Sequence, residues 1–128
     1  MVRNLLQWGS DWLQTQILTH GSGRVVYHRG GDSVEVTATI GRTEFEIESE
    51  FGVHEKVESR DFLVPAAELV LAGAWTLPKR GDLIHETMGT TVFVYEVMAP
   101  GKEPHFRYSD AFRRPLRIHT RQVAESAV

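Results

Sequence analysis

Nine consecutive residues in the first half of the chain, residues 43–51 (TEFEIESEF), alternate strictly between two kinds of side chain. Glu44, Glu46, Glu48 and Glu50 alternate with Phe45, Ile47, Ser49 and Phe51. Successive side chains of a β-strand point to opposite faces, so this pattern predicts a strand with one buried and one solvated face. We expect Phe45 and Ile47 to be buried, and Glu46 and Glu48 to be exposed.

Further strand signals surround this segment. Strand-forming residues on both sides of Gly30-Gly31-Asp32 predict a hairpin. Residues 53–64 can return antiparallel to the acidic strand, and the stretches 82–86, 91–97 and 116–120 are separated by turn residues. A proline and a glycine bracket a short apolar stretch, which predicts a one-turn helix at residues 65–69.

The start of the chain shows a different period. Leu5, Leu6, Trp12, Leu13, Ile17 and Leu18 recur at three-, four- and seven-residue spacing. This spacing predicts an amphipathic helix over residues 4–20 that packs on the rest of the subunit or on a neighbour. The predicted fold class is therefore α+β, mainly β: this helix plus a small antiparallel β-barrel or sandwich over residues 24–120 with a long presented loop. We expect one domain over residues 1–128, with a frayed tail from 121 to 128.

Composition narrows the function. The chain has 128 residues, which suits one domain, and its net charge of −3 does not favour a general nucleic-acid binder. The absence of cysteine excludes disulfides, thiolate catalysis and cysteine-based zinc sites. The apolar runs are far shorter than the ~20 residues of a membrane span, and the N-terminus has no secretory signal. We expect a chain with no membrane partner that stays in the cytosol until it assembles.

The six histidines show none of the three- to five-residue spacings that are typical of metal pairs. Ser59-Arg60-Asp61 and Ser109-Asp110 could serve a hydrolase, but the chain has no nucleophile elbow. We expect no metal, no cofactor and no enzyme activity. One alternative stays open: a small β-barrel that binds a ligand or catalyses a reaction with a buried histidine and a carboxylate.

Two charged clusters suggest an interface instead. The Glu44, Glu46 and Glu48 face can dock on a basic surface, although a merely solvated face is an equally good interpretation. Arginines and aromatics gather later in the chain, a composition typical of interface anchors and of single-strand nucleic-acid platforms. The acidic net charge favours the interface over the nucleic-acid platform, and a plain solvated loop is the other interpretation. The predicted contact residues are Arg29 and Asp32 in the hairpin loop, Glu44, Glu46, Glu48 and His54, and Phe106, Arg107, Tyr108, Asp110, Phe112, Arg113 and Arg114 in the long loop.

The order of these segments resembles a known family. SRDFLVPAAELVL (59–71), PKRGDLIHE (78–86), YEV (95–97), EPHFRYSD (103–110) and RIHT (117–120) are similar to segments of head–tail joining, head-closure or stopper proteins in the neck of tailed bacteriophages. The resemblance covers about residues 43–123, together with the leading amphipathic helix.

The resemblance implies a structural virion protein, made in the host cytoplasm and located at the head–tail interface. It implies a homo-oligomeric ring, hexameric or dodecameric, that closes the DNA exit of the head and docks the tail. The implied partners are portal and adaptor proteins above and tail-terminator or tail proteins below, with room for non-specific contact with packaged DNA. A tail-completion or tail-terminator protein is the alternative within the virion.

Overall fold

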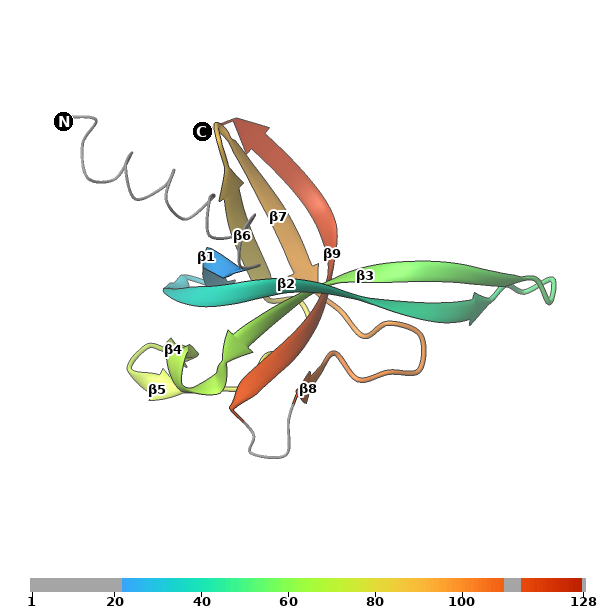
Figure 1. Ribbon diagram of the computed structural model, residues 1–128, viewed down its shortest axis with the longest axis horizontal. Helices are drawn as coiled ribbons and strands as arrows, with labels where there is room; N and C mark the ends of the chain where they lie inside the picture. The colour runs from blue at the N-terminus through green and yellow to red at the C-terminus, as the bar shows by residue number, and fades with distance from the viewer. Residues whose placement is uncertain (1–21, 110–113, 128) are drawn as a thin grey trace.

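The computed structural model describes residues 22–109 and 114–127, whose regular secondary structure is nearly all β-strand (Figure 1). The elements are β1 (Ser22–Arg29), β2 (Asp32–Glu48), β3 (His54–Pro65), the 3-10 turn η1 (Ala66–Glu68), β4 (Val70–Leu71), β5 (Ala74–Trp75), β6 (Leu83–Met88), β7 (Thr91–Val97), β8 (Phe106–Tyr108) and β9 (Pro115–Ala127). The predicted hairpin around Gly30 is confirmed, with Arg29 opposite Asp32.

The main sheet closes on itself. Its strand order is β3-β2-β1-β6-β7-β9-β8, and β9 also pairs with β3. All these pairings are antiparallel. Because β9 pairs with β3, the sheet forms a closed barrel of β1, β2, β3, β9, β7 and β6, with β8 added beside β9. β4 and β5 form a separate small hairpin.

The barrel is filled by large side chains from nearly every strand. Fully buried members of this core include Tyr27, Val36, Phe62, Val64, Ile84, Leu116 and Ile118. Ile40 lies opposite Phe62 in the ladder, so the even-numbered residues of β2 at this point face the barrel interior. The odd-numbered residues, Phe45 among them, therefore face the outer side of the barrel wall.

One part of the β2–β3 ladder leaves the barrel. β9 pairs with β3 only from Arg60 to Pro65, whereas β2 and β3 stay paired as far as Glu48 and His54. Residues 43–59 thus project as a two-stranded hairpin, which we call the arm (Figure 1). No other described strand pairs with it.

The predicted alternation of the acidic strand is confirmed, but the burial of its apolar face is not. Glu46 and Glu48 are exposed as expected. Phe45 is only half-buried, and Ile47 is 39% exposed. The arm carries these residues beyond the barrel, and the loop at Gly101 covers part of Phe45: a Cβ on that glycine would lie 3.2 Å from the Phe45 ring.

The predicted α+β class is wrong, because the described structure is all-β. The α component rested on the helix over residues 4–20, which lies outside the described residues. Within them, the helical content is η1, which confirms the one-turn helix expected after Pro65. No helix in this part of the chain is long and apolar enough to cross a membrane.

Two predictions about the C-terminal half also need correction. The tail expected to fray from Arg121 is strand, because β9 continues to Ala127 and pairs with β7 across a bulge near Tyr95. Residues 121–127 are all exposed, so no alternation marks them as strand in the sequence. The long loop before β9 contains a strand of its own, β8, which pairs with β9.

Candidate functional site

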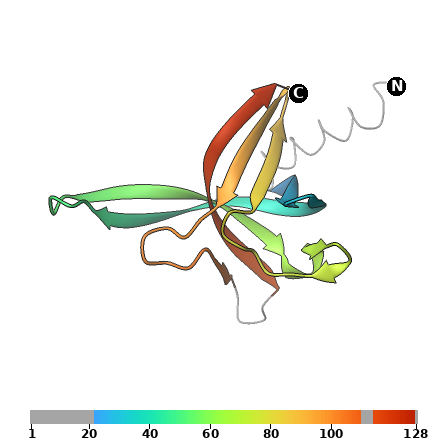
Figure 2. The ribbon, with the colours of Figure 1, turned by 180° about the vertical axis from the view of Figure 1, so that it is seen from behind.

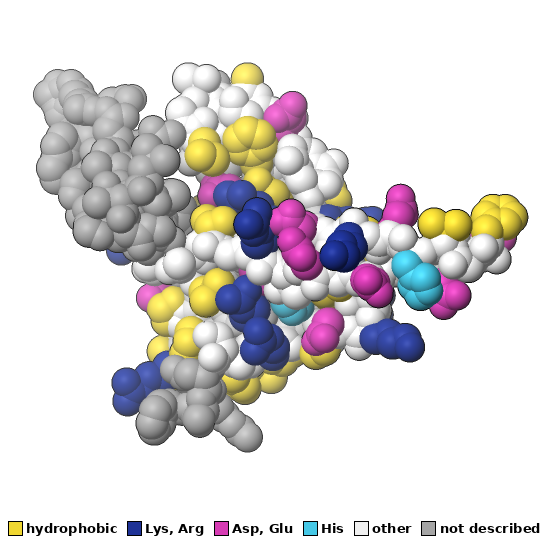
Figure 3. Space-filling model, turned by 45° about the vertical axis from the view of Figure 1, so that its right-hand side comes forward, with side chains coloured by type: hydrophobic (Ala, Val, Ile, Leu, Met, Phe, Trp, Pro, Cys, Tyr) yellow, Lys and Arg dark blue, Asp and Glu magenta, His cyan; other side chains and the backbone are white. Residues whose placement is uncertain are grey.

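The tip of the arm is an ordered turn that displays apolar side chains, which gather at the end of the arm in Figure 3. The Ser49 hydroxyl accepts hydrogen bonds from the amides of Phe51 and Val53, at 3.3 and 3.2 Å. Gly52 closes the turn with a φ of 76° and donates its N–H to the Ser49 carbonyl. Phe51 is 86% exposed and Val53 59% exposed. An aromatic displayed on an ordered turn suits docking, because binding immobilises little that is not already fixed.

The arm is strongly acidic. Residues 43–59 contain six glutamates and one lysine. Glu58 pairs with Arg42 at 3.3 Å, and a Glu46 carboxylate oxygen lies 4.0 Å from Nδ1 of His54. Glu44, Glu46 and Glu48 are exposed to solvent. The arm therefore presents a net negative charge to a docking partner.

A buried carboxylate fixes the base of the arm. Asp61 accepts hydrogen bonds from Ser59 (2.6 Å) and His119 (2.8 Å) on Oδ1, and from Thr43 (2.5 Å) and Arg117 (2.6 Å) on Oδ2. Burial favours the neutral acid, but these four donors outweigh it and hold the pKa of Asp61 well below its usual range. The donors come from β2, β3 and β9, so one side chain ties the first residue pair of the arm to the barrel.

Gly41 makes room for this arrangement. It lies opposite Asp61 in the ladder, and a Cβ at this position would come within 3.2 Å of the Arg117 guanidinium and of Leu63. The missing side chain therefore lets Arg117 cross the strand to reach Asp61.

The second surface feature is an apolar groove of about 880 Å³ beside the β4–β5 hairpin. We call it the groove; it is lined by Pro65, Ala66, Ala67, Trp75, Thr76, Leu77, Lys79, Tyr108 and Arg114. Trp75 is 77% exposed and Leu77 47% exposed. Two of these lining residues are cationic, and none of them carries a carboxylate.

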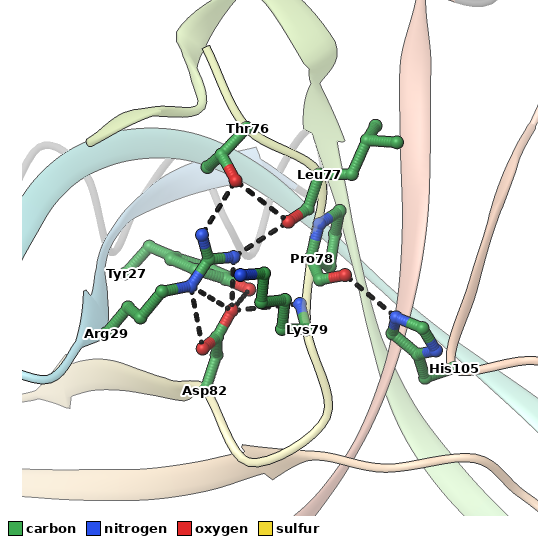
Figure 4. A network of polar contacts seen from close by, with 8 residues as sticks. All are labelled: Tyr27, Arg29, Thr76, Leu77, Pro78, Lys79, Asp82 and His105. Carbon is green, nitrogen blue, oxygen red and sulfur yellow. Dashed lines mark hydrogen bonds and ion pairs between the residues drawn. The ribbon is translucent and has the colours of Figure 1, made fainter. Parts of the chain in front are cut away.

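One wall of the groove, residues 76–79, is held by Arg29 (Figure 4). The Arg29 guanidinium donates to the Thr76 hydroxyl and to the Leu77 carbonyl, both at 2.7 Å. His105 adds a contact from the other side, with Nε2 at 2.7 Å from the Pro78 carbonyl oxygen. These contacts fix a connection between strands that has few regular backbone hydrogen bonds of its own.

Asp82 holds Arg29 in turn. Its carboxylate accepts from Arg29 Nη2 at 2.8 Å, from the Lys79 backbone N–H at 2.9 Å and from the buried Tyr27 hydroxyl. Burial raises the pKa of Asp82, but the Arg29 and Tyr27 bonds outweigh it and lower the pKa below its ordinary value. Burial and the bond to Asp82 both raise the pKa of Tyr27, so this hydroxyl stays protonated.

The structure gathers the predicted contact residues at different places. Glu44, Glu46, Glu48 and His54 share the arm; Phe106, Arg107 and Tyr108 form β8; Tyr108 and Arg114 line the groove; and Asp32 is exposed beside Arg29, which is bonded internally. Asp110, Phe112 and Arg113 lie outside the described residues. The part of each in an interface remains a prediction.

The enzyme alternative requires a buried histidine and carboxylate in catalytic geometry. His119 and Asp61 are both buried, but the Ser59 hydroxyl donates to Asp61 and lies 3.4 Å from Nδ1 of His119, the nitrogen that faces Asp61. In a catalytic triad the serine uses Nε2 instead. Here Nε2 is buried without a partner among the described residues, and Ser59 is 1% exposed. The described ranges also contain no group of three or more histidines and carboxylates arranged to hold a metal ion.

Sequence reasoning missed the groove and the burial of Asp61 and Asp82. Ser59-Arg60-Asp61 was considered only as a possible hydrolase segment, because the partner of Ser59 and Asp61 on β9, His119, lies about 60 positions away in the chain. Trp75 follows an apolar run and gave no sign of exposure. The available signal was the presence of two prolines and two glycines within residues 65–81, which indicated irregular backbone but not its use.

The chain matches the phage head–tail joining protein family over residues 3–127. It belongs to that family. No curated protein and no solved structure gives a significant match. The family is structural, and its members are virion components at the head–tail junction, where they contact head and tail proteins. The predicted resemblance is thereby confirmed.

Proposed function

We propose that this head–tail joining protein forms a homo-oligomeric ring, hexameric or dodecameric, under the portal and adaptor. The ring closes the DNA exit of the filled head and offers its lower face to the tail. One observation carries this proposal beyond family membership: two aromatic side chains, Phe51 and Trp75, are displayed in solvent on separate hairpins. Large exposed aromatics are typical anchors of protein interfaces.

The buried polar groups support a structural role as well. Asp61 accepts four hydrogen bonds, and Asp82 is held by Tyr27, Arg29 and Lys79. Carboxylates saturated with donors in this way stabilise one geometry and are poorly suited to exchange protons with a substrate. Their arrangement supports a rigid part that other proteins dock against.

The test uses a phage in which the gene for this chain carries an early stop codon. We expect DNA-filled heads and free tails that do not join, and we expect the purified chain to restore joining when it is added to the mixture. Electron microscopy of the restored particles should show a ring of this protein at the neck. Particles that join tails normally without the chain would contradict the proposal. Protein found on free tails rather than on heads would instead favour a tail-terminator role.

A further inference from the structure

We propose that the arm tip of one copy docks in the groove of the next copy, so that the ring is built from a head-to-tail contact. This inference rests on the proposed ring and names the surfaces that form it. The tip is Ile47, Phe51 and Val53, and the groove is the one bounded by Trp75 and Leu77.

The two surfaces match in apolar character. The three tip residues are the exposed large hydrophobics of the arm, and Trp75 and Leu77 are those of the groove. At about 880 Å³, the groove falls within the range of ~300–1,000 Å³ that buries a drug-sized ligand, so it can receive the Phe51 ring with its neighbours. Docking would remove both exposed aromatics from water in one contact.

The two surfaces also match in charge. The arm carries six glutamates against one lysine, whereas the described residues lining the groove include Lys79 and Arg114 and no carboxylate. Opposite charges at the rim of an apolar contact favour the correct pairing and speed association. The same charges disfavour an arm-to-arm contact between copies, because like charges would face each other.

The geometry excludes docking within one chain. The tip and the β4–β5 hairpin lie at opposite ends of the molecule in both ribbon views (Figures 1 and 2). Asp61 joins the base of the arm to the barrel, so the arm cannot fold back across the barrel without breaking the hydrogen bonds that Thr43 and Ser59 donate to Asp61. A tip that meets a different surface on another copy gives a heterologous contact, and such contacts close into rings when the rotation allows.

Cysteine cross-linking tests the contact directly, because the chain contains no cysteine of its own. Glu50→Cys places a thiol beside Phe51 without altering the anchor, and Ala67→Cys places one in the groove. The two variants are mixed, in solution and on filled heads that lack the chain, and then oxidised. We expect a disulfide-linked pair of copies. The matched control mixes Glu50→Cys with Thr87→Cys, an exposed position on β6 outside the groove, and should give at most a trace.

Disruption gives an independent readout. Phe51→Ser and Trp75→Ser change exposed side chains, so each variant should keep its circular dichroism and melting temperature. Each should weaken self-association at least about tenfold in sedimentation experiments, as expected for an aromatic anchor. Val123→Ser is the control, because it removes an exposed hydrophobic side chain that belongs neither to the tip nor to the groove. It should associate like the parent.

The outcomes separate this inference from the proposed function. Rings at the neck without cross-linking above the control would overturn the arm–groove contact and leave the ring intact. A Phe51→Ser protein that forms normal rings but fails to join tails would also overturn it, and would assign the tip to a tail protein. Heads that join tails without any copy of the chain would overturn the proposed function itself.

Discussion

The β2–β3 ladder has two halves that differ in what covers them. In the barrel half, β9 lies beside β3, and Phe62 and Val64 are completely buried. In the arm half no described strand lies alongside, and Ile47 is 39% exposed although it belongs to the same continuous ladder. Alternation therefore reports how a strand orients its side chains, whereas burial depends on which distant segment covers each face.

Phe62, Phe45 and Phe51 lie in the barrel half, in the arm and at the tip, so replacing each of them compares burial at these places with the same kind of side chain. We expect the largest loss of stability in the barrel. Phe62→Ala removes a ring that is 0% exposed and leaves a cavity, which should lower the free energy of unfolding by about 3–5 kcal/mol. Urea denaturation followed by circular dichroism measures it. A loss near 1 kcal/mol would mean that the barrel half is packed no better than the arm.

The buried carboxylate at the boundary of the two halves comes next. Asp61→Asn keeps the shape but leaves Arg117 without its counter-charge, so we expect a loss of about 3 kcal/mol at pH 7, at the low end for a broken buried pair. Glu44→Gln on the exposed face of the arm is the control and should change stability by less than about 0.5 kcal/mol. Equal losses in the two variants would contradict the buried role of Asp61.

Asp61 also predicts how stability depends on pH. Its pKa in the folded chain lies below the ordinary value of 3.8, so the unfolded chain binds the proton more tightly. The stabilisation is fully present above about pH 5 and is lost progressively as the pH falls through and below 4. Denaturation measured between pH 3 and 6 should show a steeper loss for the parent than for Asp61→Asn; parallel curves would contradict the assignment.

Phe45 should give an intermediate effect. Its ring is half-buried under the loop at Gly101, so Phe45→Ala should cost about 1–2 kcal/mol in the isolated chain. If the arm is covered by a neighbour in the ring, the same substitution should destabilise assembled protein more than monomer. Thermal melts at low and high protein concentration make that comparison.

The smallest effect on folding is expected at the tip. Phe51 is 86% exposed, so Phe51→Ala should change the stability of the monomer by no more than about 0.5 kcal/mol. Urea denaturation of dilute protein provides the measurement. A loss above 1 kcal/mol would show that the ring packs within its own chain, and the arm would no longer contrast with the barrel.

Strands and turns whose position depends on neighbouring residues were predicted from the sequence. The strand Thr91–Val97 was predicted with its observed ends, and the Gly30 hairpin was found from its turn residues. The end of β9 was not predicted, because residues 121–127 are exposed on both faces and are held by backbone pairing with β7 and by the Arg121–Glu96 ion pair.

The candidate surfaces were predicted in part. The acidic face was visible as a sequence pattern, but the loop at Gly101 that partly covers the opposite, apolar face at Phe45 was not. The groove joins residues of β3, η1, β5 and β8 with Arg114, which precedes β9, and in the Asp61 cluster His119 lies 58 positions along the chain from Asp61. Contacts of this kind depend on the closure of the barrel, for which a single sequence contains no local signal.

The Asp61 cluster also turns the arm into a lever. Six residue pairs separate it from the turn, which places the tip roughly 20 Å away at the usual rise per residue. A tilt of about 10° at the base would then shift Phe51 by about 3–4 Å, more than a close-packed contact tolerates. In a closed ring every copy makes the same angle with the next, so the arm angle that Asp61 sets would determine how many copies close the ring. A substitution at Asp61 that still allows folding is therefore expected to change the diameter of the assembly before it abolishes it.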